Sequence, residues 1–105
     1  MVKILGIEES ADLISQPETF LYDVRTPPEY DRDHIEGAIL LELNKFKRFP
    51  DQYLFGSDNV VFVCARGIRS LAAANLAESL GAKNVYSIDG GMYKWNIVRC
   101  KYANL

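Results

Sequence analysis

Short apolar runs alternate along the chain with stretches whose apolar residues recur at helical spacing. The short runs are rich in branched and aromatic side chains, which favours strands at Phe20–Val24, Ala38–Leu41, Val60–Val63 and Asn84–Ile88. The run Val60–Val63 is the most apolar of the four, so it is predicted to lie in the centre of a sheet.

Helices are predicted between these runs. The expected segments are Glu8–Ser15, a short helix from Pro27, part of Glu42–Leu54 before and after Pro50, Ile68–Leu80, and a terminal helix from near Met92. In the fourth segment a single helical face carries Ile68, Leu71, Ala72, Asn75, Leu76 and Leu80, the pattern of a stripe that faces the core. Gly81 stands at the position of a helix C-cap glycine. The alternation of strands and helices predicts an α/β fold with a mostly parallel central sheet and helices on both faces.

The third element should begin with a capping box. Thr26 is the expected N-cap, Pro27 occupies the first helical position, and Glu29 can reach back three residues. A capping box depends only on residues close together in the sequence, so it predicts the start of a helix without any tertiary contact.

Length and composition bound the function. The 105 residues are 49% hydrophobic and 25% charged, which predicts a single compact domain over residues 1–105. A net charge of −2 argues against a nucleic-acid partner, and the longest apolar run is too short to cross a membrane. The first residues lack an apolar segment of secretory length, so a cytoplasmic location is expected. Cys64 and Cys100 are too few for a disulfide framework and do not have zinc-ligand spacing.

The segment from Cys64 to Ser70 has the chemistry of a reactive site. It joins the most apolar strand to the following helix, which is where parallel sheets place their ligands. Loop amides and the helix N-terminus favour an anion there, and Arg66 and Arg69 add positive charge that favours the thiolate of Cys64. No acidic residue lies within the loop, so an anion from outside is expected to complete the site. Taken alone, a cysteine at the end of an apolar strand is more often a small buried side chain than a nucleophile.

Three motifs in the same order resemble those of single-domain rhodaneses, the sulfurtransferase family. They cover about three-quarters of the chain. The motifs are Asp23-Val24-Arg25 with Glu29-Tyr30 and His34-Ile35-Glu36-Gly37-Ala38, the loop C-x-x-G-x-R-S at Cys64, and Gly90-Gly91-Met92-Tyr93-Lys94-Trp95.

The resemblance implies a rhodanese-like three-layer fold and a two-step sulfur transfer through a persulfide of Cys64. The donor would be a small anion such as thiosulfate or a persulfide-bearing protein, and the acceptor a thiol or cyanide. The residues implied to bind the substrate are Ala65, Arg66, Gly67, Ile68 and Arg69. No metal or organic cofactor is implied, because the cysteine carries the sulfur. The chain departs from the family where Ala65 follows the cysteine directly and where Asp33 replaces a common glycine.

Other reactive side chains have structural interpretations. His34 is expected to be hydrogen-bonded within a turn away from the loop, and Asp23, Arg25 and Glu29 to form structural ion pairs. Met92 and Trp95 are expected in the core, and Cys100 is expected to be a spectator thiol, the alternative being a resolving partner for Cys64.

Two other functions remain open. A cysteine phosphatase or arsenate reductase also uses a cysteine and an arginine around an amide-lined loop, but Cys64 and Arg69 enclose one residue fewer than phosphatases of this type do. A non-enzymatic rhodanese-like module that carries sulfur or binds a protein is the second alternative, and a carrier would keep the cysteine as well.

Overall fold

The computed structural model describes residues 1–53, 55–56 and 58–103, with side chains described as far as Arg99. Within these residues five strands form one sheet in the order β1-β5-β4-β2-β3, and each neighbouring pair is parallel. The strands are β1 (Lys3–Leu5), β2 (Thr19–Asp23), β3 (Ile39–Leu40), β4 (Asn59–Val63) and β5 (Asn84–Ile88). The predicted α/β class and parallel sheet are confirmed.

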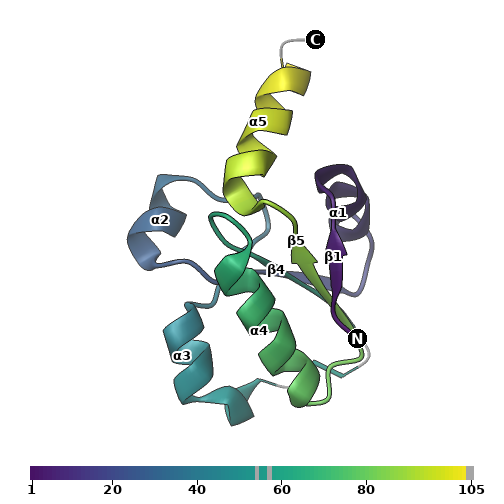
Figure 1. Cartoon of the computed structure of the whole chain (residues 1–105), viewed down its shortest axis with the longest axis vertical. Coiled ribbons are helices and arrows are strands. Elements are labelled where there is room, and N and C mark those ends of the chain that lie inside the picture. The colour runs from purple at the N-terminus through teal and green to yellow at the C-terminus, as the bar shows by residue number, and fades with distance from the viewer. Residues whose placement is uncertain (54, 57, 104–105) are drawn as a thin grey trace.

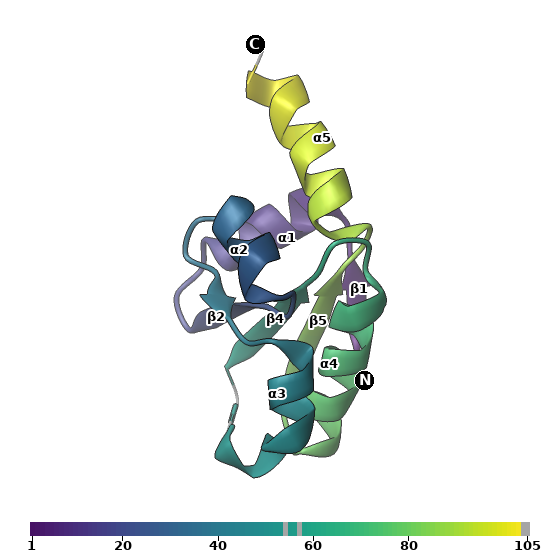
Figure 2. The ribbon, with the colours of Figure 1, turned by 90° about the vertical axis from the view of Figure 1, so that its left-hand side faces the viewer.

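Helices cover both faces of the sheet, as expected (Figures 1 and 2). They are α1 (Ile7–Ile14), α2 (Pro27–Arg32), α3 (Leu43–Arg48), α4 (Ile68–Ser79) and α5 (Gly91–Ala103), with the 3₁₀ turn η1 (Pro50–Gln52) after α3. Helices α3 and α4 pack together, and α1 contacts α5. The far end of α5 extends away from the body of the molecule (Figure 2).

The centre of the sheet supplies most of the core. Val60, Val61, Phe62 and Val63 of β4 are fully buried, and alternate residues of this strand belong to two hydrophobic clusters on opposite faces. Cys64 continues the cluster that β4 shares with α3 and α4. The end of β4 is therefore held on both sides, which makes it a rigid base for the loop that follows.

The structure corrects the prediction for the face of α4. Ile68 is 79% exposed, whereas the helix buries Ser70 and three alanines. The small side chains let the helix backbone approach the sheet closely, so the larger Ile68 and Leu71 are left at the side of the helix. The predicted stripe is therefore only partly correct, because Leu76 and Leu80 pack against the core whereas Ile68 is exposed.

Two further differences concern short elements. Strand β1 was not predicted, since its three residues at the sheet edge carry too little pattern. The predicted strand Ala38–Leu41 is reduced to Ile39–Leu40, and Pro50 begins a 3₁₀ turn instead of continuing α3. Among the described residues there is no helix with the length and hydropathy required to span a membrane.

Candidate functional site

The candidate site is the loop between β4 and α4. Cys64 directly follows β4 and is 1% exposed. Gly67 is the N-cap of α4 and adopts a φ of 99°, a left-handed conformation that favours glycine. This turn bends the chain around the sulfur of Cys64 and presents the N-terminus of α4 to the same space.

The sulfur of Cys64 has two polar contacts in the loop. The backbone N–H of Gly67 donates to Sγ at 3.0 Å, and Sγ lies 3.4 Å from Oγ of the buried Ser70. The Ser70 hydroxyl in turn lies 2.8 Å from the hydroxyl of Ser87 on β5. A sulfur held by an N–H donor and a hydroxyl is placed to carry negative charge.

Arg69 has an internal anionic partner. Its two terminal nitrogens donate to the two carboxylate oxygens of Glu29 on α2 at 2.8 and 2.9 Å. The hydrogen bonds from Arg69 hold the pKa of Glu29 at about 2, against the opposing effect of its partial burial and with help from Thr26. The same pairing raises the pKa of Arg69. Part of the positive charge beside Cys64 is therefore balanced from within the chain, since Glu29 pairs with Arg69, while the expected anion from outside stays a prediction for the rest of the site.

The N-terminus of α2 shares this carboxylate. Both the backbone N–H and the side-chain hydroxyl of Thr26 donate to Oε1 of Glu29, at 3.1 and 2.9 Å. Glu29 therefore reaches back to the N-cap, as predicted, and also holds Arg69 beside the loop.

Arg66 is exposed and stacks on an aromatic ring. Its guanidinium carbon lies 3.9 Å from the centre of the Tyr93 ring on α5. Among the described residues Arg66 forms no ion pair with a carboxylate.

The first turn of α5 is hydrogen-bonded to the loop. The N–H groups of Met92 and Tyr93 donate to the carbonyls of Cys64 and Ala65 at 2.7 and 3.0 Å. Gly91 permits this approach, since a Cβ there would lie only 2.2 Å from the Cys64 carbonyl oxygen. The sequence resemblance included this glycine pair but did not show that its helix holds the loop.

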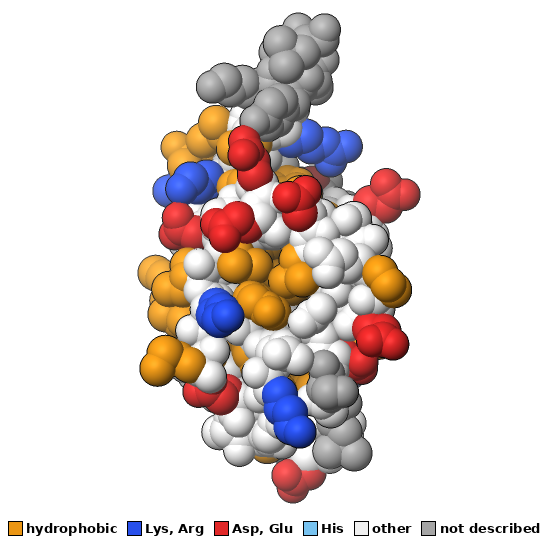
Figure 3. Space-filling model, turned by 90° about the vertical axis from the view of Figure 1, so that its right-hand side faces the viewer, with side chains coloured by type: hydrophobic (Ala, Val, Ile, Leu, Met, Phe, Trp, Pro, Cys, Tyr) orange, Lys and Arg blue, Asp and Glu red, His pale blue; other side chains and the backbone are white. Residues whose placement is uncertain are grey.

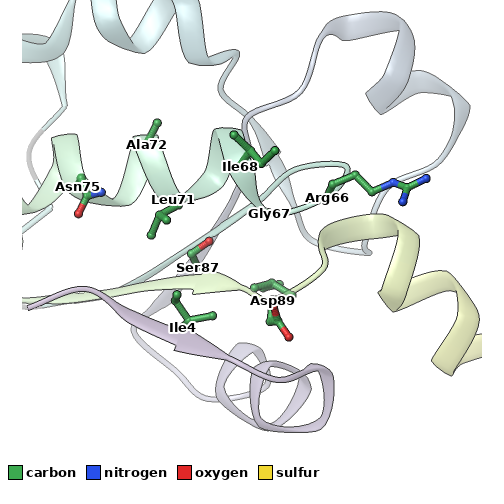
Figure 4. Close-up of a pocket in the computed structure, with 10 residues that line it drawn as sticks. Ile4, Arg66, Gly67, Ile68, Leu71, Ala72, Asn75, Ser87 and Asp89 are labelled. Carbon is green, nitrogen blue, oxygen red and sulfur yellow. The ribbon is translucent and has the colours of Figure 1, made fainter.

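Two pockets flank the loop. The first, called here the thiol pocket, has a volume of about 290 Å³ and is lined by Cys64, Ala65, Arg66, Ile68 and Arg69. The second, called here the helix pocket, has a volume of about 500 Å³ and lies between α4 and the strands β1 and β5 (Figure 4). Its walls include Ile4, Leu71, Ser87 and Asp89. On the face shown in Figure 3 hydrophobic side chains gather around a hollow in the surface.

The structure brings all five predicted substrate-binding residues together around Cys64. Ala65, Arg66, Ile68 and Arg69 line the thiol pocket, and Gly67 contacts the sulfur through its N–H. Glu29, Ser87 and Tyr93 were not placed at the site by the sequence, and Ser70 was included only as the last residue of the loop motif. Only Glu29 carried a signal, because an isolated arginine beside a thiol needs a carboxylate somewhere in the fold.

The remaining candidates have structural partners. Asp23 and Arg25 form a buried ion pair at 2.8 Å, as expected of a structural role. Nδ1 of His34 is 2.8 Å from the Tyr30 carbonyl oxygen, and its ring stacks on the Tyr30 ring, which confirms the interpretation of a hydrogen-bonded turn residue.

The predictions for α5 concern Met92, Trp95 and Cys100. Met92 is buried and Trp95 packs against the same cluster, as predicted. The side chain of Cys100 lies outside the described residues, so its predicted spectator role remains a prediction. Among the described residues no three or more His, Cys, Asp or Glu side chains form a group that could hold a metal ion.

Asp33 occupies the position where glycine was expected. Its φ of −167° is extended backbone that any residue adopts, so this position does not require glycine. The Asp33 carbonyl accepts a hydrogen bond from Arg25 at 2.6 Å, and its carboxylate accepts one from Asn96 at 2.8 Å. The substitution therefore adds a contact to α5 without changing the course of the turn.

Comparison with known proteins agrees with this fold. The model of the rhodanese-like domain matches residues 7–97, so the chain belongs to the rhodanese-like domain family. Thiosulfate sulfurtransferase GlpE of Tolumonas auensis is 33% identical over 94 residues, which cover 90% of this chain and 88% of that protein. These findings support a rhodanese-type sulfurtransferase.

Solved structures of similar fold come from several organisms. A rhodanese-related protein of Thermoplasma volcanium has a TM-score of 0.80 at 22% identity, covering 91% of this chain and 92% of its own. A protein of Rhodopseudomonas palustris described as of unknown function and a possible tyrosine phosphatase has a TM-score of 0.81 at 27% identity, covering 93% of this chain and 82% of its own.

Proposed function

We propose that this protein is a sulfurtransferase that carries a sulfane sulfur as a persulfide of Cys64. The observation that carries the proposal is the sulfur of Cys64 in the thiol pocket, with the Gly67 N–H directed at it and Arg66 and Arg69 in the pocket wall. This arrangement suits a sulfur that bears negative charge both before and after it accepts a second sulfur. The proposed substrates are a small anionic donor such as thiosulfate, or a protein persulfide, and a thiol or cyanide acceptor.

In the first step, the Cys64 thiolate attacks the outer sulfur of thiosulfate. A new S–S bond forms at Cys64, the S–S bond of thiosulfate breaks, and its electron pair leaves with sulfite. In the second step cyanide attacks the outer sulfur of the persulfide, so thiocyanate leaves and the thiolate returns. The first step requires Cys64 as a thiolate and the second releases it as one, so neither step needs a general base, in keeping with the position of His34 in a turn held by Tyr30.

The charge around the pocket fits an anionic donor. Arg69 is neutralised by Glu29, which leaves Arg66 on the Tyr93 ring as the more open cation. We assign attraction of the donor to Arg66, and positioning of the loop and pocket wall to Arg69. Arg66, which follows Ala65, thus places a positive charge at the rim of the thiol pocket.

The phosphatase alternative is less well supported. Four residues separate Cys64 from Arg69, and the guanidinium of Arg69 is engaged by both oxygens of Glu29. A phosphate oxyanion would have to displace that bidentate pair to be held by Arg69.

The proposal is tested by thiocyanate formation from thiosulfate and cyanide. The wild-type chain and Cys100→Ser are expected to be active, and Cys64→Ser to lose activity with its fold intact. Full activity in folded Cys64→Ser, or equal loss in both variants, would overturn the assignment. A non-enzymatic carrier would accept sulfur at Cys64 from a protein persulfide but release no thiocyanate in this assay.

A further inference from the structure

Two buried hydroxyls connect the sulfur of Cys64 to the helix pocket. Ser70 of α4 is fully buried and lies 3.4 Å from the sulfur, and Ser87 of β5 is 2% exposed and lies 2.8 Å from Ser70. Ser87 also lines the helix pocket, and Figure 4 shows its side chain pointing from β5 toward α4. The three groups thus form a row that crosses from β4 through α4 to β5.

The direction of the hydrogen bonds along this row depends on the charge of the sulfur. The Ser70 hydroxyl has a single proton, which can be donated either to Cys64 or to Ser87 but not to both. An anionic sulfur accepts a hydrogen bond from the Ser70 hydroxyl. Ser70 must then accept a hydrogen bond from Ser87 if both hydroxyls are to be satisfied. A hydroxyl that accepts one hydrogen bond becomes a stronger donor of the next.

We propose that Ser87 is a positioning residue for the sulfur of Cys64, which acts by turning the Ser70 proton toward the thiolate. This inference rests on the proposed function only in taking Cys64 as the nucleophile. Ser87 does not touch the sulfur, so its effect must pass through Ser70. Ser87 faces the helix pocket, where solvent can donate to its hydroxyl while its own proton is directed at Ser70.

Several charged groups lie near the loop or on the elements packed against it. They are Arg66 in the loop, Arg69 on α4 with its partner Glu29 on α2, the pair Asp23 and Arg25 at the end of β2, and Asp89 after β5. Each of these charges is unchanged in a variant of Ser87. A change in the pH profile of such a variant therefore reports the hydroxyl row and not the surrounding charges.

The test is the rate at which iodoacetamide alkylates Cys64, measured across about pH 5 to 10 by mass spectrometry of the peptide that contains it. In Ser87→Ala the midpoint of the rate profile is expected to rise by about 0.5 pH unit, a roughly threefold loss of thiolate on the acidic side. Ser87→Thr retains a hydroxyl and is expected to restore the wild-type midpoint. Ser10→Ala is the matched control, because Ser10 is an equally buried serine whose hydroxyl donates to the Gly6 carbonyl in α1.

A double-mutant comparison separates this role from simple packing. If Ser87 acts through Ser70, the combined variant Ser70→Ala with Ser87→Ala has the same midpoint as Ser70→Ala alone. Additive shifts, or a midpoint in folded Ser87→Ala within about 0.1 unit of wild type, would overturn the proposal. If Ser87→Ala does not fold, Ser87→Cys can be used instead. Its side chain is similar in shape to serine but slightly larger, and its thiol is a weaker hydrogen-bond donor, so the midpoint is expected to shift in the same direction.

This measurement is independent of sulfur transfer. Alkylation requires no sulfur donor, so a wild-type protein that takes no sulfur from thiosulfate would contradict the proposed function while the profile still reports on Ser87. Conversely, an unchanged profile in Ser87→Ala would overturn the role of Ser87 and leave the persulfide mechanism standing.

Discussion

Glu29 and Arg69 are forty residues apart in the sequence, yet they form a bidentate ion pair beside Cys64. The pair joins the N-terminus of α2 to the first turn of α4, and Thr26 fixes the carboxylate from the other side. One carboxylate therefore serves as a helix cap and as the anchor of the site's arginine. The position of the loop depends on α2 being folded against it.

Replacement of Glu29 by Gln tests this ion pair through the pH dependence of stability. The pKa of Glu29 in the folded chain is about 2, below the ordinary value of 4.5, so its stabilising effect is complete above 4.5 and declines as pH falls toward 2. Near neutral pH the variant is expected to lose about 1–2 kcal/mol, with the side chains of the pair partly exposed. Less than half of that difference should remain at about pH 3. Urea unfolding of both proteins provides the measurement, and a difference that stays constant from neutral pH to about pH 3 would contradict it.

Arg69 and His34 should differ in their effect on turnover. Arg69→Ala removes a wall of the thiol pocket and leaves Glu29 without its partner, so kcat/KM is expected to fall by about tenfold or more. His34→Gln keeps a polar side chain in an exposed turn and is expected to stay within about twofold of wild type. Thiocyanate formation by variants with a wild-type circular dichroism spectrum provides the comparison, and the reverse order would mean that the loop has been misassigned.

Gly91→Ala should disrupt the loop more than a comparable glycine change elsewhere. The added Cβ would meet the Cys64 carbonyl and Ala65 in addition to the strain of a φ of 56°. Gly81 is the matched control, because its φ is also positive, at 99°, while nothing lies within 4 Å of an added Cβ. We expect Gly81→Ala to cost about 1 kcal/mol and Gly91→Ala about 3 kcal/mol or more, measured by urea unfolding. Equal losses would show that the contact between α5 and the loop is unimportant for stability.

Arg66 should affect the donor more than the acceptor. In Arg66→Ala the KM for thiosulfate is expected to rise by about three- to tenfold, while kcat stays within about twofold, since the sulfur and its N–H donor are unchanged. Tyr93→Leu removes the ring on which the guanidinium stacks and is expected to raise the same KM by a smaller factor. A loss confined to kcat would instead place Arg66 in the chemical step. A KM for thiosulfate that depends strongly on salt in the wild type but not in Arg66→Ala would support attraction of the anion.

Local patterns in the sequence predicted the parts of the fold that depend on neighbours along the chain. The run Val60–Val63 is the central strand, and the capping box of Thr26 and Glu29 begins a helix, because both depend on a few adjacent residues. The nearby Cys64 and Gly67 likewise formed the predicted loop at the carboxyl end of the strand. The three motifs then predicted membership of the rhodanese family.

Features that depend on distant contacts were not predicted. The buried face of α4 was predicted only in part: Leu76 and Leu80 pack against the core, but close packing against the sheet selects alanine and serine and leaves Ile68 exposed. The partner of Arg69 was not predicted, because the loop itself has no acidic residue. Glu29 had been expected in a cluster with Asp23 and Arg25, but it pairs with Arg69 instead. No spacing rule relates Ser70 to Ser87, which meet only when α4 packs on β5.

Persulfide formation on Cys64 is tested by the intact mass of the purified, reduced protein after brief incubation with thiosulfate, before and after cyanide is added. We expect a gain of one sulfur, about 32 Da, that maps to Cys64 and is removed by cyanide, with no gain in Cys64→Ser. A sulfur found on another residue, or no gain in a folded sample from either thiosulfate or a protein persulfide, would contradict the proposal that Cys64 carries the sulfur.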